Sequence, residues 1–87
     1  MARIMKFELK ALDVQTVSMP TAAELLDVQY QNGKLVMWAL CGKEGWAVEG
    51  RTFRVAPDEV EIPDEPGTHI ATVQTTDQMY VHHLFEM

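Results

Sequence analysis

Cysteine is nearly absent from this sequence, and its scarcity excludes two classes of small protein. Cys41 is the only cysteine among 87 residues, so the chain can form no internal disulfide and has no cysteine cluster for structural zinc. A single thiol between Leu40 and Gly42 is typical of a small buried apolar side chain. The fold must therefore depend on its hydrophobic core, for which an apolar content of 47% is sufficient.

Positive charge is also scarce. Seven Lys and Arg residues stand against 13 Asp and Glu residues, which gives a formal net charge of −6. This balance disfavours direct binding of DNA or RNA, because phosphate contacts require clustered basic side chains. The negative charge suits solubility alone or contact with a basic protein. We therefore expect a protein partner rather than a nucleic acid.

Long apolar runs and transport signals are missing as well. The longest apolar run, "LVMWALC" from Leu35 to Cys41, is far shorter than the roughly 20 residues that span a bilayer. The opening "MARIMKFELK" lacks the apolar region of a secretory signal peptide. We therefore expect a protein of the cytosol, bacterial or host cell, without a membrane partner.

The familiar signatures of catalysis are not found. Ser18 is the only serine and lies in "VSMP", not in the G-x-S-x-G turn of a nucleophile elbow. No histidine belongs to an H-E-x-x-H motif, and "GKEG" at Gly42–Gly45 lacks the remainder of a phosphate-binding loop. We predict a protein that is not an enzyme and uses no cofactor.

What the sequence has in quantity is alternation of apolar and polar side chains. In "RIMKFEL", Met5, Phe7 and Leu9 share one side, as in a half-buried strand. Further strand-like segments are "VQTVSM", "LLDVQYQ", "KLVMWALC", "RTFRVA", "THIATVQT" and "MYVHHLFE". Between them, "PTAAELL" is read as either one helical turn or a bend. The pattern predicts one all-β domain over residues 1–87, a small antiparallel β-sandwich or barrel of about seven short strands with at most one short helical turn.

The dipeptide Asn32-Gly33 gives the clearest local prediction. Both residues tolerate the positive φ angles of a type I′ turn, so the flanking segments should form a hairpin with a two-residue loop. This register places Tyr30 opposite Leu35 and the following apolar side chains on one face: Leu26, Val28, Tyr30, Leu35, Met37, Ala39 and Cys41. Val36, Trp38 and Leu40 occupy the other face. A strand that is apolar on both faces is expected to be central in its sheet.

An acidic segment and one tryptophan are the candidate contacts for a protein partner. "PDEVEIPDEP" combines carboxylates with prolines, which is typical of a solvated, semi-rigid loop. Trp46 follows a glycine at a loop, where an aromatic anchor could be exposed. The partner-binding candidates are Trp46, Asp58, Glu59, Glu61, Asp64 and Glu65. The alternative is an oligomeric binder of an anionic small molecule such as a nucleotide signal, through Lys34, Arg51 and Arg54.

The adjacent histidines near the end of the sequence are expected to be structural. Successive strand residues point to opposite faces, so His82 and His83 cannot hold one ion together. One register of the last hairpin places His69 diagonal to His82, and the other places it diagonal to His83. Only the first register would allow a weak metal site of His69, His82 and Glu86. We favour no metal, with one of the adjacent histidines exposed and the other in the core with a satisfied ring nitrogen. Whether His83 is that structural residue near the core is left open by the sequence.

Several short motifs occur in a recognisable order. They are K-F-x-L, Q-T-V-x-M-P, V-Q-x-Q-N-G, W-A-L, R-x-F-R-V and V-x-H-x-F-E. They fall on Lys6, Phe7, Gln15, Thr16, Pro20, Gln29, Gln31, Asn32, Gly33, Trp38, Ala39, Leu40, Arg51, Phe53, Arg54, His83, Phe85 and Glu86. In these motifs the chain resembles a family of small phage and prophage proteins.

The resemblance implies a phage origin and an accessory role rather than an enzyme activity. We therefore expect a protein that binds a host protein or complex, for example to inhibit a bacterial defence complex. A virion or assembly component is the remaining alternative. Because a chain of this size has little core and several strand edges, we also expect a homo-oligomer, most simply a dimer.

Overall fold

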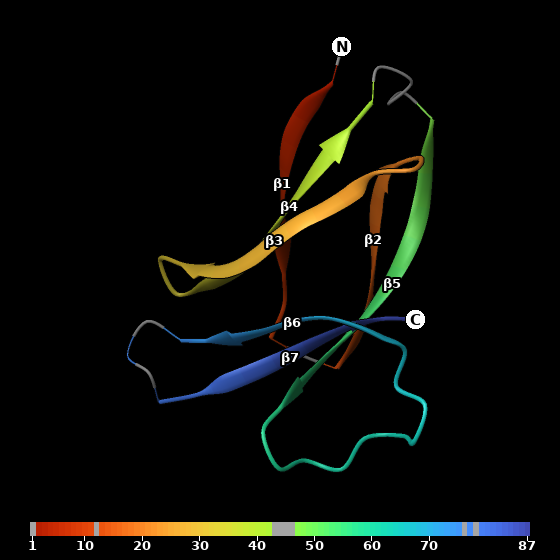
Figure 1. Cartoon of the computed structure of the whole chain (residues 1–87). Helices are drawn as coiled ribbons and strands as arrows, with labels where there is room; N and C mark the ends of the chain where they lie inside the picture. Colours follow the sequence, from red (N-terminus) through yellow and green to blue (C-terminus); the bar gives the residue numbers. More distant parts are fainter. Residues whose placement is uncertain (1, 12, 43–46, 76, 78) are drawn as a thin grey trace.

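The computed structural model describes residues 2–11, 13–42, 47–75, 77 and 79–87. Within these residues the chain forms seven strands and no helix (Figure 1). The strands are β1 Arg3–Leu9, β2 Val14–Pro20, β3 Glu24–Gln31, β4 Lys34–Cys41, β5 Val48–Pro57, β6 Thr68–Gln74 and β7 Val81–Glu86. The predicted all-β fold is thus confirmed. Across the described residues, no helix is long and apolar enough to cross a membrane.

The strands build two antiparallel sheets that pack together as a sandwich (Figure 1). One sheet has three strands in the order β1-β4-β3, and the other has four in the order β2-β5-β7-β6. Strand β4 is central in its sheet, as its two apolar faces predicted. Edge strands β3 and β6 contact each other along one side of the sandwich.

The hairpin between β3 and β4 has the predicted register. Tyr30 lies opposite Leu35, and Val28 lies opposite Met37. Asn32 and Gly33 have φ angles of 53° and 78°, which is the left-handed conformation that a type I′ turn requires.

Leu26 departs from the prediction because β3 contains a bulge. Leu25 pairs with Ala39 and Asp27 pairs with Trp38, so Leu26 is the extra residue between them. The insertion turns Leu26 away from the core, and it is 47% exposed, while Leu25 packs against the core instead. Its predicted place on the apolar face was therefore wrong. A bulge reverses the alternation of every residue beyond it.

The segment "PTAAELL" forms a bend and then a strand, not a helical turn. Thr21 and Ala22 make the turn, the Ala23 amide donates to the Pro20 carbonyl over 3.2 Å, and β3 begins at Glu24. Of the two structures expected for this segment, the bend is the one observed, and β3 already begins within it.

The core lies between the two sheets and combines side chains from both. Its largest fully buried members are Phe53, Met19, Met37, Leu84 and Cys41. Cys41 has no exposed surface, in agreement with its prediction as a small buried apolar residue. On β5, Phe53 and Val55 face this core while Arg54 faces outward, so polar groups collect on the outer face of the four-stranded sheet.

Candidate functional site

The outer face of the four-stranded sheet brings together residues from three segments. In β7, His83 and Phe85 share this face. In β6, His69 lies opposite Phe85 and Thr72 lies opposite His83. His69 is therefore on the same face as His83, so the second of the two predicted registers is the one observed.

The third segment is the loop after β5, whose Asp58 reaches this face. Asp58, His83, Thr72 and His69 form a continuous hydrogen-bonded row, which we call the polar chain. Asp58 Oδ1 lies 2.6 Å from His83 Nε2, and His83 Nδ1 lies 3.0 Å from Thr72 Oγ1. Thr72 Oγ1 lies 2.9 Å from His69 Nε2. The His69 ring also meets Phe85 edge-on, with 5.5 Å between ring centroids. Both ring nitrogens of His83 are thus engaged, and the ring lies on the outer face of the sheet rather than in the core.

The chemistry of these groups fixes the direction of the hydrogen bonds when the histidines are neutral. An ionised carboxylate only accepts, so His83 carries its proton on Nε2 and donates to Asp58. His83 Nδ1 is then an acceptor and receives the Thr72 hydroxyl proton. His69 Nε2 must donate to the Thr72 oxygen. The polar chain can therefore move a proton between a hydroxyl and an imidazole oriented by a carboxylate.

His82 points to the other side of the sheet and links the two layers. Its Nδ1 lies 2.6 Å from the hydroxyl of Tyr30 on β3, with the ring centroids 5.7 Å apart. Burial raises the pKa of Tyr30 above its usual value, which keeps the phenol neutral. The adjacent histidines thus have separate roles, as the strand periodicity predicted.

Removing this link should weaken the sandwich modestly. We expect Tyr30→Phe to lower the free energy of unfolding by about 1 kcal/mol, because one partly buried hydrogen bond is lost and His82 Nδ1 is left without its partner. Urea unfolding followed by circular dichroism measures the change. Tyr80→Phe is the matched control, since Tyr80 is 60% exposed and should change little. Equal effects of the two variants would contradict the role of this bond.

Glu86 is held by Arg51 and is not placed for metal binding. Arg51 Nε and Nη2 lie 2.6 and 2.8 Å from the two Glu86 carboxylate oxygens, and Arg51 Nη1 donates to the Ala23 carbonyl over 2.5 Å. The hydrogen bonds from Arg51 lower the pKa of Glu86, while those to Glu86 raise the pKa of Arg51. Arg51 thus joins β7 of its own sheet to the residue that precedes β3 of the other sheet.

The weak metal site of His69, His82 and Glu86 is not assembled. His69 lies on the outer face with His83, whereas His82 and Glu86 point to the inner side. Among the described residues, no group of three or more His, Cys, Asp or Glu side chains is arranged to hold a metal ion.

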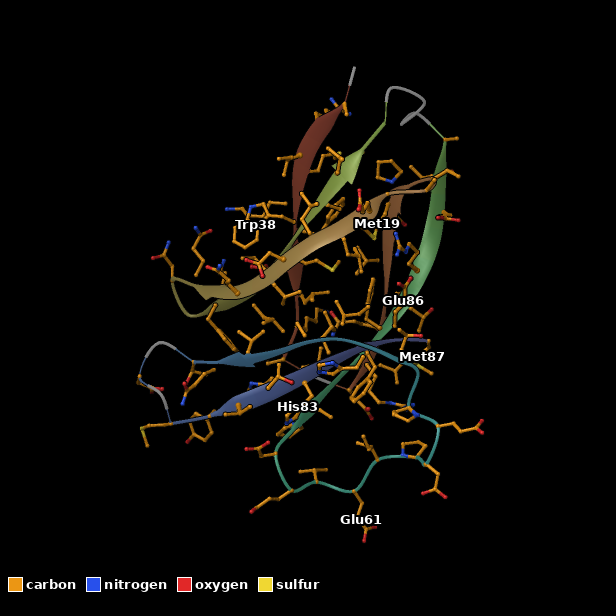
Figure 2. All side chains as sticks on the ribbon, viewed as in Figure 1. Met19, Trp38, Glu61, His83, Glu86 and Met87 are labelled. Atoms are coloured by element: carbon orange, nitrogen blue, oxygen red, sulfur yellow. The ribbon has the colours of Figure 1, made fainter. Side chains whose placement is uncertain are left out.

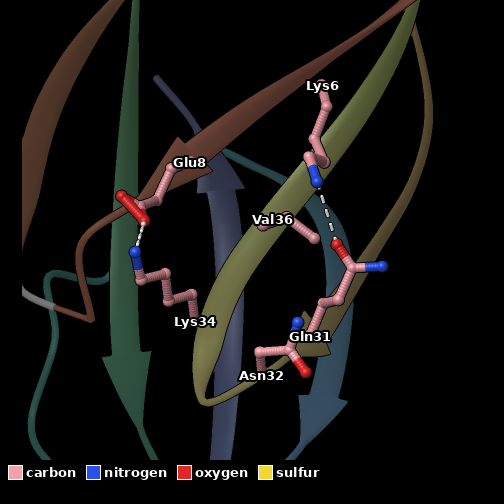
Figure 3. Close-up of a pocket in the computed structure, with 6 residues that line it drawn as sticks. All are labelled: Lys6, Glu8, Gln31, Asn32, Lys34 and Val36. Atoms are coloured by element: carbon pink, nitrogen blue, oxygen red, sulfur yellow. Dashed lines mark hydrogen bonds and ion pairs between the residues drawn. The ribbon is translucent and has the colours of Figure 1, made fainter.

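The three predicted ligand-binding cations are also apart. Lys34 lies in a surface pocket of about 340 Å³ on the outer face of the three-stranded sheet, 3.2 Å from Glu8 (Figure 3). Arg51 lies between the sheets and is paired with Glu86. Arg54 lies on the outer face of the other sheet, 3.5 Å from the Pro66 carbonyl. They do not line a common pocket for an anion.

The predicted acidic loop connects β5 to β6, and we call residues 58–67 the acidic strap. Its first residue is fixed to β7 by the bond to His83 and by the Asp58 amide, 3.3 Å from the Val81 carbonyl. Its far end is fixed because Gly67, with φ of 117°, packs directly against the Glu86 backbone. Between these points the strap projects away from both sheets, with Glu61 at its tip (Figure 2).

The middle of the strap presents carboxylates and apolar side chains to solvent. Glu59, Glu61, Asp64 and Glu65 are all exposed, and no described basic residue forms an ion pair with any of them. Val60 and Ile62, which alternate with the carboxylates, are 56% and 38% exposed. Trp46, the remaining partner-binding candidate, falls outside the described residues.

Comparison with known protein families matches the whole chain to one of them. The sequence model of a domain of unknown function, DUF7352, matches residues 1–87. The chain belongs to the DUF7352 family. No curated protein and no solved structure matches it.

In this DUF7352 chain, sequence reasoning identified the strap carboxylates but missed the polar chain. Thr72 was not a candidate, and Asp58 was not assigned to His83. Their meeting depends on a bulge in β6 between His69 and Ala71. If β6 paired regularly from His69 opposite Phe85, Thr72 would lie opposite His82 and on the other face of the sheet. The available signal was only the run of hydrogen-bonding side chains along "THIAT".

Proposed function

We propose that the protein is a binding module that attaches to a basic surface of another protein through the acidic strap. The observation that carries the proposal is the strap itself: a segment fixed at both ends whose exposed carboxylates lack cationic partners within the described chain.

Fixing the strap at both ends favours binding. A loop that is already ordered loses less conformational entropy when a partner binds, so more of the interaction energy appears as affinity. Here the first anchor is Asp58 on β7, and the second is Gly67 against Glu86. The strap can present its side chains without the rest of the domain changing shape.

The charge and the apolar side chains together describe the partner. Exposed carboxylates steer a basic surface and accelerate association. Val60 and Ile62 supply apolar area that a partner can bury between the charged contacts. The matching surface is a shallow apolar recess bordered by Lys and Arg.

For the biological setting we propose an accessory protein of phage origin that acts on a host protein complex, for example a defence complex. Support comes from the resemblance of the motifs to small phage and prophage proteins and from the acidic charge of the chain. In this setting the protein would work by occupying a surface, with no chemical step.

Affinity capture from host lysate followed by binding measurements with charge variants tests the proposal. We expect a stoichiometric basic partner whose affinity falls roughly tenfold in the double variant Glu61→Gln/Asp64→Asn, mainly through slower association. Asp13→Asn/Glu24→Gln is the matched control, because it removes the same charge from exposed positions outside the strap. Surface plasmon resonance at low and high salt separates association from dissociation.

The replacement Ile62→Ser tests the apolar part of the contact, and it should accelerate dissociation without affecting the fold. Equal losses of affinity in the strap pair and in the control pair would refute the strap as the binding site. Failure to recover any stoichiometric partner would refute the proposed function.

A further inference from the structure

We propose that His83 and Asp58 form a proton-operated latch on the acidic strap, so that acidification withdraws Asp58 from a basic partner. This inference rests on the proposed function of the strap. It starts from the 2.6 Å contact between Asp58 Oδ1 and His83 Nε2, which is the only side-chain bond between the strap's described carboxylates and the sheet.

The polar chain has two proton arrangements. With neutral histidines, His69 donates to Thr72, Thr72 donates to His83, and His83 donates to Asp58. A proton added to His83 makes Nδ1 a donor as well. The Thr72 oxygen must then accept from His83, and because Thr72 is exposed its hydroxyl proton can turn to water. One proton therefore reverses the hydrogen bond between Thr72 and His83, while His69 can keep its own proton on Nε2.

The groups that face His83 identify Asp58 as its charged partner. Asp58 is the carboxylate in contact with it, and His69 is the titratable group on β6. On β5, Ala56 lies opposite His83 and carries no charge, while Arg54 lies opposite Phe85 and points to the same face. Glu59 follows Asp58 on the strap and is exposed. Asp58 is therefore the charge that responds directly when His83 gains a proton.

Protonation changes the availability of Asp58. A neutral imidazole donates one hydrogen bond to the carboxylate but carries no charge, so a Lys or Arg of a partner meets no competing cation there. A charged imidazolium adds the attraction of opposite charges to the same bond, so the partner's cation must displace an ion pair. Since histidine ordinarily changes charge between about pH 5 and 8, binding should weaken across this interval.

Nuclear magnetic resonance of the free chain tests the latch without any partner. Between about pH 5 and 8, we expect the His83 ring signals and the backbone amides of Asp58 and Glu59 to shift together. In His83→Gln, whose side-chain amide can still donate to Asp58 but does not titrate, the strap amides should stop responding. His69→Gln is the matched control and should retain the response. Strap amides that ignore pH in the wild-type chain, or that respond equally in His83→Gln, would overturn the latch.

Binding of a decalysine peptide then tests the consequence for a basic partner. From about pH 7.5 to 5.5, we expect the wild-type affinity to fall roughly two- to fivefold, the fall to persist in His69→Gln, and most of it to vanish in His83→Gln. If the affinity falls equally in His69→Gln and His83→Gln, the cause is the general loss of negative charge at low pH. That outcome would overturn the latch. Absence of decalysine binding at either pH would count against the proposed function, while the resonance experiment still decides the latch.

Discussion

Replacing Gly67 by alanine should destabilise the domain by about 3 kcal/mol. Gly67 has φ of 117°, a conformation that L-residues rarely adopt. A Cβ atom at this position would lie 2.5 Å from the carbonyl oxygen and 3.0 Å from the carbonyl carbon of Glu86. Both are backbone atoms of β7, so relief requires the strap and the strand to separate.

Urea unfolding of the wild-type chain and of Gly67→Ala measures this loss of stability. Gly33→Ala provides a matched control. Gly33 also has a positive φ, 78°, but a Cβ there meets nothing within 4 Å. We expect a loss of about 1 kcal/mol for Gly33→Ala, from backbone strain alone. If both substitutions cost the same, the close contact between Gly67 and β7 does not determine the position of the strap. Because Gly67 is the far anchor of the strap, Gly67→Ala should also weaken partner binding.

Replacing Arg51 by methionine should cost about 2–3 kcal/mol at neutral pH. The side chains of Arg51 and Glu86 are only 18% and 24% exposed, so solvent replaces the ion pair poorly. The substitution leaves the Glu86 carboxylate without its partner and the Ala23 carbonyl without its donor. Lys34→Met breaks a pair whose side chains are 68% and 55% exposed, and it should cost well under 1 kcal/mol.

The same ion pair predicts a dependence of stability on pH. Arg51 lowers the pKa of Glu86 in the folded state. The resulting stabilisation is fully present above the ordinary glutamate pKa and is lost as pH falls through the lower, folded-state pKa. The difference in stability between wild type and Arg51→Met should therefore shrink in acid. Urea unfolding at a series of pH values from about 3 to 7 checks the sign, and a difference that grows toward low pH would contradict the assignment.

The fold was predictable where the decisive information is local. Asn32-Gly33 encodes both the turn and the register of the hairpin, because only residues tolerant of positive φ fit there. The two apolar faces of β4 likewise identified it as a central strand. The bulges were not predictable, since nothing in the sequence around Leu26 or Ile70 marks either of them as an inserted residue. One unpaired residue is enough to move every later side chain of the strand to the opposite face of the sheet.

The candidate site was predictable as a composition but not as a set of contacts. The acidic strap is visible in the sequence because carboxylates and prolines together favour an exposed loop. The partners of Arg51 and His83 are not visible, because each pair joins segments far apart along the chain: Glu86 lies 35 residues from Arg51, and Asp58 lies 25 residues from His83. Such pairs follow from strand order, which a single sequence does not specify.

The two bulges also have a consequence for assembly. They lie on neighbouring edge strands, β3 and β6, and border a notch of about 100 Å³. A bulged edge presents its amides and carbonyls out of step with a regular strand, so it cannot readily be extended by another chain. Edge strands β1 and β2 pair without interruption. A dimer that continues either sheet would therefore form along β1 or β2, which leaves the side formed by β3 and β6 outside the interface.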